Sequence, residues 1–341
     1  MNRPGGGVTV LIPVRNEASF IAKAVASVQA AAEDVPGVEI IVIDGMSDDE
    51  TRNIAAELAA SDPRIKVLAN PRRTVPHAMN MGIEVASGEV IIRIDGHAEI
   101  MPDFIGNALA ELEAHPECAC VGGPIENVSE NSVADAISNA MSSTFGVGNA
   151  RFRTGGQDGY VDTLAFGAYR KADLLAIGLF DEALTRNEDD ELNYRLVRAG
   201  RKIWFSNSIR SRYYVRSSFK KLYRQYFQYG YWKVYVNRKH GSITSLRQIV
   251  PPLFVGTIGV LALLLPVLIY ARLSLTAILA LYFSLAAVYA LRAEPQPRRA
   301  PAVVAAFVIL HTGYGLGYWA GVRDFTVLRR QPTARSAELT R

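Results

Sequence analysis

Three long apolar segments near the C-terminus of the sequence constrain the fold most strongly. They cover residues 252–270, 273–291 and 301–322, and none contains a formally charged residue. Each is close to the ~20 residues that a helix needs to cross a bilayer core. We expect about three transmembrane helices, the first two forming a tight hairpin around Arg272. The third contains His311 and several glycines, so packing between helices or a partly re-entrant course stays open.

Charge is distributed unevenly along the 341 residues. Residues 1–200 contain 16 Lys and Arg against 30 Asp and Glu, whereas residues 201–341 contain 21 against 3. This split favours an acidic soluble part joined to a basic part that meets an anionic surface. The positive-inside rule places residues 292–299 in the cytosol, with the N-terminal part. A third segment that crosses completely would put the arginines after residue 322 on the opposite side.

The first 122 residues alternate short apolar runs with segments of helical period. Strand–helix alternation predicts an α/β domain with a doubly wound, mainly parallel sheet, whose ligands bind at the carboxyl ends of the strands. Neither GxGxxG nor GxxxxGK[ST] follows the first run, which disfavours a dinucleotide enzyme or a P-loop NTPase. The expected strands are 8–14, 38–44, 64–70, 89–95 and 118–123, and the expected helices are 17–32, 49–60, 76–86 and 102–114.

Polar residues gather where these strands end. Asp44 ends the second strand, and Asp95 and His97 follow the fourth. A lone Asp after a strand usually caps a helix, and Asp48 and Asp49 fit that reading. Carboxylates from several strands at one sheet edge nevertheless need a cation or hydrogen-bond donors to balance their charge.

Four ordered blocks carry a family resemblance. "VLIPVRNEASFIAKAVASV", "IIVIDGMSDDET", "IIRIDGHAEI" and "GLFDEALTRNEDDELNYRL" resemble the inverting nucleotide-sugar glycosyltransferases of family 2, over roughly residues 8–240. The whole layout, with a basic aromatic segment and C-terminal membrane helices, is similar to that of the succinoglycan-type exopolysaccharide glucosyltransferases. The resemblance implies a GT-A-like fold and a hexosyltransferase that inverts the anomeric centre.

The resemblance also implies the donor and metal residues. Asp95 matches the first acid of the family's DxD element, and His97 stands in place of the second acid, so the pair would hold Mg²⁺ or Mn²⁺ on the donor diphosphate. An imidazole in that place softens the site towards Mn²⁺. Glu99 is a possible further ligand, and a His that only caps the turn is the alternative. The nucleotide pocket would be lined by Pro13, Arg15, Glu17 and Asp44, with Asp44 positioned to bind the nucleotide base. Asp95 would also belong to the donor-binding residues.

The acidic block at residues 187–195 matches the family's catalytic segment. Asp189 corresponds to the catalytic base, which takes the acceptor hydroxyl's proton during attack on the anomeric carbon. Glu188 and Arg195 would orient that base. Read without the resemblance, the block is an acidic helix start.

Acceptor binding is expected from two other segments. The resemblance assigns Gly167 to close approach of the acceptor sugar and Arg170 to contact with the diphosphate. Gln228 and Trp232 lie in a segment similar to the QxxRW element of processive synthases, although Tyr231 replaces its Arg. Residues 146–161 read equally well as a mobile loop or a disordered connector.

Residues 201–240 contain eleven Lys and Arg, no acid and many aromatic residues. This composition favours helices at the lipid headgroup level. RNA binding would explain the same composition less economically, because membrane spans adjoin the segment. The expected organisation is a cytosolic transferase domain at 1–205, interface helices at 206–248, about three transmembrane helices at 249–322 and a basic, disordered tail at 323–341.

The sequence therefore predicts a multi-pass inner-membrane enzyme with a cytoplasmic catalytic domain and no nucleic-acid partner. It would move a single hexose from a UDP-sugar to a lipid-linked, polyprenyl-diphosphate saccharide in exopolysaccharide or cell-surface glycan synthesis, using Mg²⁺ or Mn²⁺. Two alternatives stay open. One is a polyprenyl-phosphate hexose synthase, and the other is a non-catalytic nucleotide-sugar-binding scaffold of an export complex.

Overall fold

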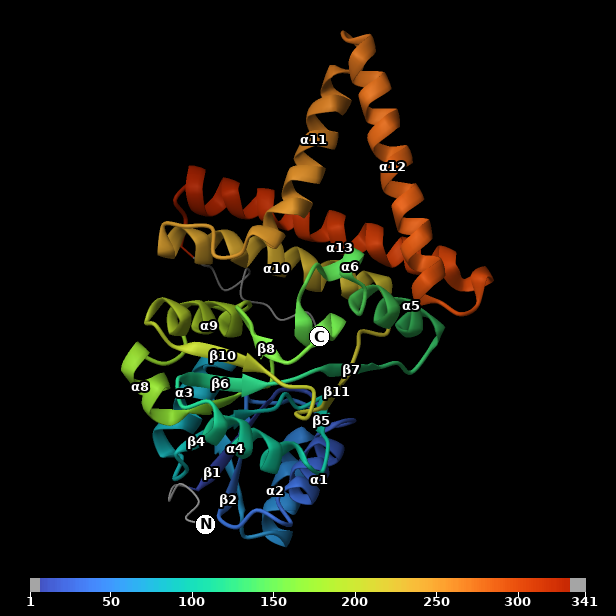
Figure 1. Cartoon of the computed structure of the whole chain (residues 1–341). Coiled ribbons are helices and arrows are strands. Elements are labelled where there is room, and N and C mark those ends of the chain that lie inside the picture. The colour runs from blue at the N-terminus through green and yellow to red at the C-terminus, as the bar shows by residue number, and fades with distance from the viewer. Residues whose placement is uncertain (1–6, 332–341) are drawn as a thin grey trace. The chain divides into compact units, whose positions relative to one another are not determined.

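A computed structural model describes residues 7–331 of the chain (Figure 1). It divides into two compact units, each built from two stretches of sequence. The first contains Met1–Glu126 and Gly155–Tyr214, and the second contains Asn127–Thr154 and Val215–Arg341. Residues 127–154 therefore group with the apolar helices, although they were expected inside a transferase domain that ends at residue 205.

The first unit is built on an eight-stranded mixed sheet. Six of its strands are parallel, while β8 and β9 run antiparallel to their neighbours. This confirms the expected doubly wound, mainly parallel, GT-A-like architecture. In spatial order the strands are β3 (Ile65–Ala69), β2 (Val38–Asp44), β1 (Val8–Val14), β4 (Val90–Arg93), β9 (Ala168–Arg170), β6 (Cys118–Gly122), β10 (Lys202–Phe205) and β8 (Gly159–Tyr160).

Helices connect these strands at the positions that the hydrophobic period predicts. Every residue of β1 and β2 is buried, as a sheet covered on both faces requires. A second, three-stranded sheet has the order β5 (Ala98–Ile100), β11 (Ser211–Tyr214) and β7 (Ile125–Val128). The helices of this unit are α1 (Ile21–Ala31), α2 (Thr51–Ser61), α3 (Val75–Val85), α4 (Phe104–Ala114), α8 (Lys171–Ile177) and α9 (Glu188–Arg198).

The second unit is helical. Small and apolar side chains of α5, α10, α12 and α13, including Ala140, Leu222, Ala290 and Phe307, form its buried core. Its elements are α5 (Ser132–Met141), α6 (Thr144–Val147), α7 (Arg151–Thr154), α10 (Phe219–His240), α11 (Val250–Leu264), α12 (Ile269–Ala293) and α13 (Ala300–Gly321), with short 3₁₀ turns at Leu246–Ile249 and Pro297–Arg299 and a π-helical segment at Val322–Val327.

Three helical segments in the second unit are long and apolar enough to cross a membrane. α11 and α12 form a hairpin, and only 6% and 11% of their apolar stretches are buried within the protein. Of the apolar stretch that contains α13, 50% is buried. Two expected irregular segments are ordered instead. α6, α7 and β8 occupy half of residues 146–161, and the π-helical segment includes the first residues of the expected tail, whose residues 332–341 lie outside the described part.

Candidate active site

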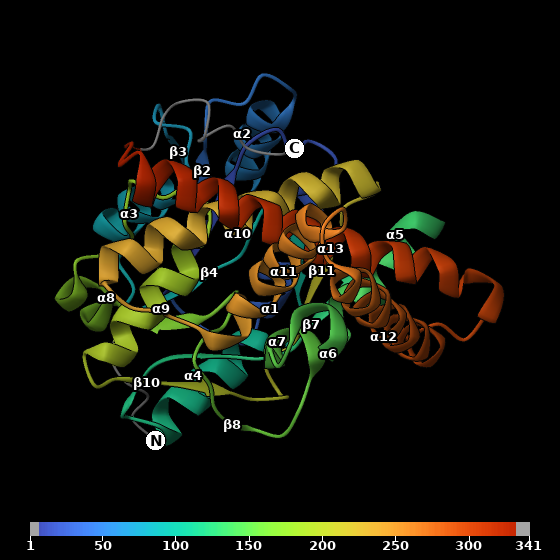
Figure 2. The same cartoon turned by 90° about the horizontal axis from the view of Figure 1, so that it is seen from above.

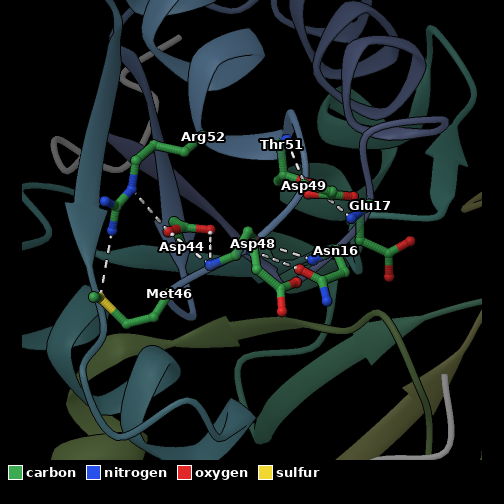
Figure 3. A network of polar contacts seen from close by, with 9 residues as sticks. Asn16, Glu17, Asp44, Met46, Asp48, Asp49, Thr51 and Arg52 are labelled. Atoms are coloured by element: carbon green, nitrogen blue, oxygen red, sulfur yellow. Dashed lines mark hydrogen bonds and ion pairs between the residues drawn. The ribbon is translucent and has the colours of Figure 1, made fainter.

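The turn after β1 and the loop after β2 form one wall of the candidate site (Figure 3). The parallel register pairs Val14 with Asp44, so the two strands end side by side. Hydrogen bonds then join the segments that follow. The backbone N–H of Glu17 donates to Thr51 Oγ1 (2.7 Å), that of Asn16 to Ser47 Oγ (3.0 Å), and that of Asp48 to Asn16 Oδ1 (3.1 Å).

Asp44 is held in place at this wall. Its carboxylate is almost fully buried and accepts hydrogen bonds from the backbone N–H of Ser47 (3.2 Å) and from Arg52 Nε (3.3 Å). Asp49 acts as a turn former just before α2, whose N-cap is Glu50, because it accepts from the backbone N–H groups of Thr51 and Ala18. Pro13, in β1 opposite Ile43, and Arg15, in the following turn, complete the expected set on this wall.

Asp95 lies just beyond β4, at the same sheet edge. β4 pairs in parallel with β1, with Arg93 opposite Leu11, so the residues after Arg93 continue towards the turn that carries Glu17. Arg93 Nε donates to Asp95 Oδ1 over 3.1 Å. The start of α9 meets the same arginine, because Arg93 Nη2 donates to Glu188 Oε1 over 3.0 Å.

Arg93 therefore brings together the two acidic motifs that the sequence keeps 93 to 95 positions apart. Its side chain is 9% exposed, and the Glu188 side chain is 8% exposed. Burial disfavours the charged guanidinium, but the carboxylates of Asp95, Glu188 and Asp189 outweigh it and raise the pKa of Arg93 above its ordinary value. Arg93 was not among the site residues expected from the sequence, where its signal is a lone arginine inside an otherwise apolar strand.

Asp189 occupies the first turn of α9, beside Glu188. The positive end of the helix dipole favours carboxylates in this turn, and Asp189 Oδ1 accepts the backbone N–H of Asp190 (2.8 Å). Burial and the neighbouring Glu188 charge nevertheless raise the pKa of Asp189 to about 6, with Arg93 acting in the opposite direction. A carboxylate with that pKa is a stronger proton acceptor than an exposed one and is still ionised near neutral pH.

His97 is buried against Glu17, which links the end of β4 to the turn after β1. His97 Nδ1 lies 2.9 Å from Glu17 Oε1. The His97 ring packs against the Tyr213 ring at an interplanar angle of 59°. In the neutral imidazole this hydrogen bond places the hydrogen on Nδ1 and the lone pair on Nε2. Nε2 is buried and has no hydrogen-bond partner among the described residues.

This arrangement fits a histidine prepared as a metal ligand. A metal-binding histidine is usually supported by a carboxylate that accepts a hydrogen bond from its other ring nitrogen, as Glu17 does here. Asp95 lies two residues away in the chain. Residues 7–331 contain no group of three or more His, Cys, Asp or Glu side chains that could hold an ion by themselves. The expected third ligand, Glu99, instead accepts a hydrogen bond from Tyr214 Oη.

Arg195 does not orient Asp189. Its guanidinium donates to Glu191 Oε1 (2.9 Å) and to the carbonyl oxygens of Ile177 (2.6 Å) and Leu179, and thereby ties α9 to the loop after α8. The arginine that meets the first turn of α9 is Arg93, through its hydrogen bond to Glu188. The distance of six residues along a helix explains the difference, because it turns Arg195 away from Asp189.

Arg170 and Gly167, the two acceptor residues expected near β9, both make contacts that the fold itself requires. Arg170 pairs with Val90, at the opposite end of β4 from Asp95, and donates to the carbonyl oxygens of Cys118 and Leu112. The structure therefore does not bring Arg170 to the site. Gly167 does lie beside it, since its carbonyl accepts the backbone N–H of Arg93. A Cβ at Gly167 would stand 2.5 Å from Cys120 Sγ, so packing already requires a glycine.

Gln228 and Trp232 lie one turn apart on α10, in the second unit. The Trp232 side chain is fully buried and packs against Tyr231, Tyr235 and Phe325. Their assignment to the acceptor stays a prediction.

Comparison with known proteins shows the family of the chain. The model of "Glycosyl transferase family 2" matches residues 9–174. The succinoglycan biosynthesis protein ExoA of Rhizobium meliloti is 31% identical over 93% of this chain and 95% of its own length. The chain belongs to glycosyl transferase family 2. This confirms the resemblance and identifies the protein as a glycosyltransferase enzyme.

Two further relatives have names that describe their reactions. The dolichyl N-acetyl-α-D-glucosaminyl phosphate 3-β-D-2,3-diacetamido-2,3-dideoxy-β-D-glucuronosyltransferase of Methanococcus voltae is 30% identical over 68% of this chain and 74% of its own. The GalNAc(5)-diNAcBac-PP-undecaprenol β-1,3-glucosyltransferase of Campylobacter jejuni is 28% identical over 40% of this chain and 50% of its own. At family level, the protein acts in the synthesis of polysaccharides or lipid-linked glycans.

Proposed function

We propose that this family 2 enzyme moves one hexose from a UDP-sugar to a lipid-linked, polyprenyl-diphosphate saccharide, with inversion at the anomeric carbon. The observation that carries the proposal is the bridge from Asp95 through Arg93 to Glu188, next to Asp189. It unites the donor-side acid and the candidate base in one cluster. Such a cluster suits a reaction in which a diphosphate leaves one face of a sugar while an alcohol attacks the other.

In this proposal each residue has one task. Asp44 and the wall built from the β1 and β2 ends bind the nucleoside. Asp189 accepts the proton of the acceptor hydroxyl as the new glycosidic bond forms, and the bond between the anomeric carbon and the UDP oxygen breaks. Glu188 and Arg93 hold Asp189 in position, and the buried Arg93 charge keeps part of it ionised below neutral pH.

Asp95 and His97 Nε2 would hold a divalent cation. When bound, such a cation would supply positive charge next to the departing diphosphate. Glu17 fixes the tautomer and orientation of His97. The mixed oxygen and nitrogen donor set favours Mn²⁺ over Mg²⁺, because Mg²⁺ prefers oxygen ligands.

The acceptor class is supported by the relatives. Two of them are named for acceptors that are joined to dolichyl phosphate or to undecaprenol through a diphosphate, and a third for polysaccharide biosynthesis. Three apolar helices in this chain are long enough to cross a membrane, which suits an acceptor that stays in the lipid phase. We propose an inner-membrane location with the catalytic unit in the cytoplasm, where UDP-sugars are made, and assign Gln228 and Trp232 to acceptor binding.

Purified full-length protein tests the proposal. With Mn²⁺, a UDP-sugar and a polyprenyl-diphosphate saccharide, UDP release and an inverted product linkage are expected. Turnover with polyprenyl phosphate alone would instead identify a polyprenyl-phosphate hexose synthase. Binding of UDP-sugar with no release of UDP, over a panel of donors and membrane lipid extracts, would identify a non-catalytic scaffold.

A further inference from the structure

The backbones of α10 and α13 are in direct contact inside the second unit. A Cβ added at Gly317 would lie 2.0 Å from the carbonyl oxygen of Phe227, and one at Gly230 would lie 2.0 Å from that of Tyr314. Neither position leaves room for any side chain. Glycines from both helices thus form a seam like those that join helices tightly in membranes.

The seam is regular and extends over two turns. Three glycines of α13, spaced four residues apart, face three residues of α10 with the same spacing, and both series ascend together. The two helices are therefore parallel, in a fixed register. The pairs are Gly313 with Tyr223, Gly317 with Phe227, and Gly321 with Tyr231.

Polar contacts add to the attachment near the last glycine. Tyr231 Oη donates to Asp324 Oδ2 over 3.2 Å, and Asn237 Nδ2 to Tyr318 Oη over 3.4 Å. Asp324 also pairs with Arg323 over 2.9 Å. Whatever position α10 takes at a membrane, α13 and its charged end must share it.

α10 is not able to cross a bilayer. It contains six Lys and Arg, and two of them, Arg224 and Lys233, lie well inside its 22 residues. A charged residue at the centre of a spanning helix costs about 2.5–3.5 kcal/mol on insertion scales. Aromatic and basic residues in one helix are instead typical of the headgroup region.

α13 crosses the base of the α11–α12 hairpin rather than running beside it (Figures 1 and 2). It meets the first turns of α11, where Trp319 Nε1 donates to Pro252 O (2.9 Å) and Gly315 faces Pro251. On α12 it meets the second half, where Tyr282 Oη lies 2.8 Å from His311 Nδ1. The α11 contacts lie at the start of that helix, and the α12 contact at Tyr282 lies near the middle of α12.

We propose that only α11 and α12 span the membrane, and that α10 and α13 lie together along one membrane–water interface. The exposed side chains of α13 that would face lipid include Leu316 and Trp319, and Trp is enriched at that depth. The occupant of this face is the lipid bilayer itself, because the face is continuous with the exposed apolar hairpin. This inference does not depend on the donor, the acceptor or the metal.

Two spans also remove the conflict over charge. Arg272, in the first turn of α12 at the far end of the hairpin, would be the one cation of the hairpin on the opposite side. The arginines at the end of α12, before α13 and after it would share the side of α10, as the positive-inside rule requires. They are Arg292, Arg298, Arg299, Arg323, Arg329 and Arg330.

Nitroxide depth measurements on the full-length protein in lipid vesicles test the proposal. Single labels at Ile309 and Leu316 are seven residues apart on α13, and labels at Leu281 and Val288 are an equal distance apart on α12. Seven residues of an upright helix span about 10 Å. We expect a depth difference of roughly that size on α12, and less than about 4 Å on α13. A difference near 10 Å on both helices would overturn the proposal.

Cysteine accessibility in spheroplasts gives a second, independent readout. The native Cys118 and Cys120 are both buried, so background labelling is low. With a membrane-impermeant maleimide, Arg272→Cys should react in intact spheroplasts, whereas Ser242→Cys should react only after permeabilisation. Thr326→Cys, after α13, is expected to behave as Ser242→Cys does. Labelling of Thr326→Cys in intact spheroplasts would show a third span and refute the inference.

Discussion

Arg93 Nη2 lies 3.0 Å from Glu188 Oε1, although the two residues are 95 positions apart in the sequence. Both side chains are buried, and the same guanidinium binds Asp95. A buried pair of this kind contributes little net stability but is costly to break from one side. Its value to the enzyme is that it fixes the distance between the donor-side acid and the start of α9.

Removing Arg93 should therefore harm both stability and activity. We expect Arg93→Met to lower the free energy of unfolding by about 3–5 kcal/mol, because Asp95 and Glu188 lose their buried partner. Thermal unfolding of the detergent-solubilised protein measures the loss. Adding Glu188→Gln to Arg93→Met should restore part of it, whereas additive losses in the double variant would argue against the pair.

Asp189→Asn should abolish proton removal while leaving the fold intact. We expect kcat to fall by roughly 10²–10⁴-fold, the usual contribution of a general base, with donor binding little changed. Asp190→Asn, in the same helical turn, is the matched control and should stay within a few-fold of the native rate. Equal losses in the two variants would mean that the turn, and not the Asp189 carboxylate, is what matters.

The pH profile should report the raised pKa of Asp189. The base is active when ionised, so activity is expected to fall as pH decreases through about 6. Arg93 favours the ionised form, so Arg93→Lys, with a less well placed charge, should move this acidic limb to higher pH. For stability the sign is opposite: a carboxyl group with a raised pKa contributes stability at low pH that is lost as pH rises through about 6. An acidic limb near pH 4 would contradict the assignment.

The metal preference should depend on His97. His97→Asp restores two oxygen donors, so we expect the ratio of Mg²⁺-supported to Mn²⁺-supported activity to rise. Free Mn²⁺, measured by electron paramagnetic resonance in the presence of UDP, gives the binding constant directly. Glu17→Gln should weaken Mn²⁺ binding by about 10–100-fold through loss of support to His97. Unchanged Mn²⁺ binding in His97→Ala would remove His97 from the site.

The glycine seam makes a prediction about stability alone. Gly317→Ala places a Cβ where the Phe227 carbonyl stands, and we expect roughly 1–3 kcal/mol of destabilisation from overpacking. Gly259→Ala on α11 is the control, because nothing lies within 4 Å of its added Cβ. A similar melting temperature for both variants would show that α10 and α13 leave room for a Cβ at Gly317.

Much of the first unit could be predicted from the sequence. Strands such as Val8–Val14 and Val38–Asp44 were identified to the residue, because buried parallel strands are continuously apolar and end in turn-forming residues. The same logic located Asp44 and Asp95, whereas the role of the acidic start of α9 came from the family resemblance. These signals are local, and they stand at strand and helix ends.

The remaining features depend on contacts between distant residues. In the sequence, Arg93 is a single charged residue in an apolar strand. Its role becomes visible only with the hydrogen bond to Glu188. Arg170 and Arg195 look like phosphate or base partners, but their guanidinium groups bind backbone carbonyls. By hydropathy and length, α13 is apolar and long enough to cross a membrane. Hydropathy could not reveal that the backbone of α10 occupies the space beside its glycines.

The seam and the hairpin should also diverge differently among natural relatives. α11 and α12 meet few neighbours, so any sufficiently apolar residues serve there, and their sequences are free to drift. Gly317 and Gly230 have no such freedom, since every other amino acid would push two main chains apart. Related enzymes that keep this architecture should therefore retain small residues at these positions while the hairpin beside them changes almost beyond recognition.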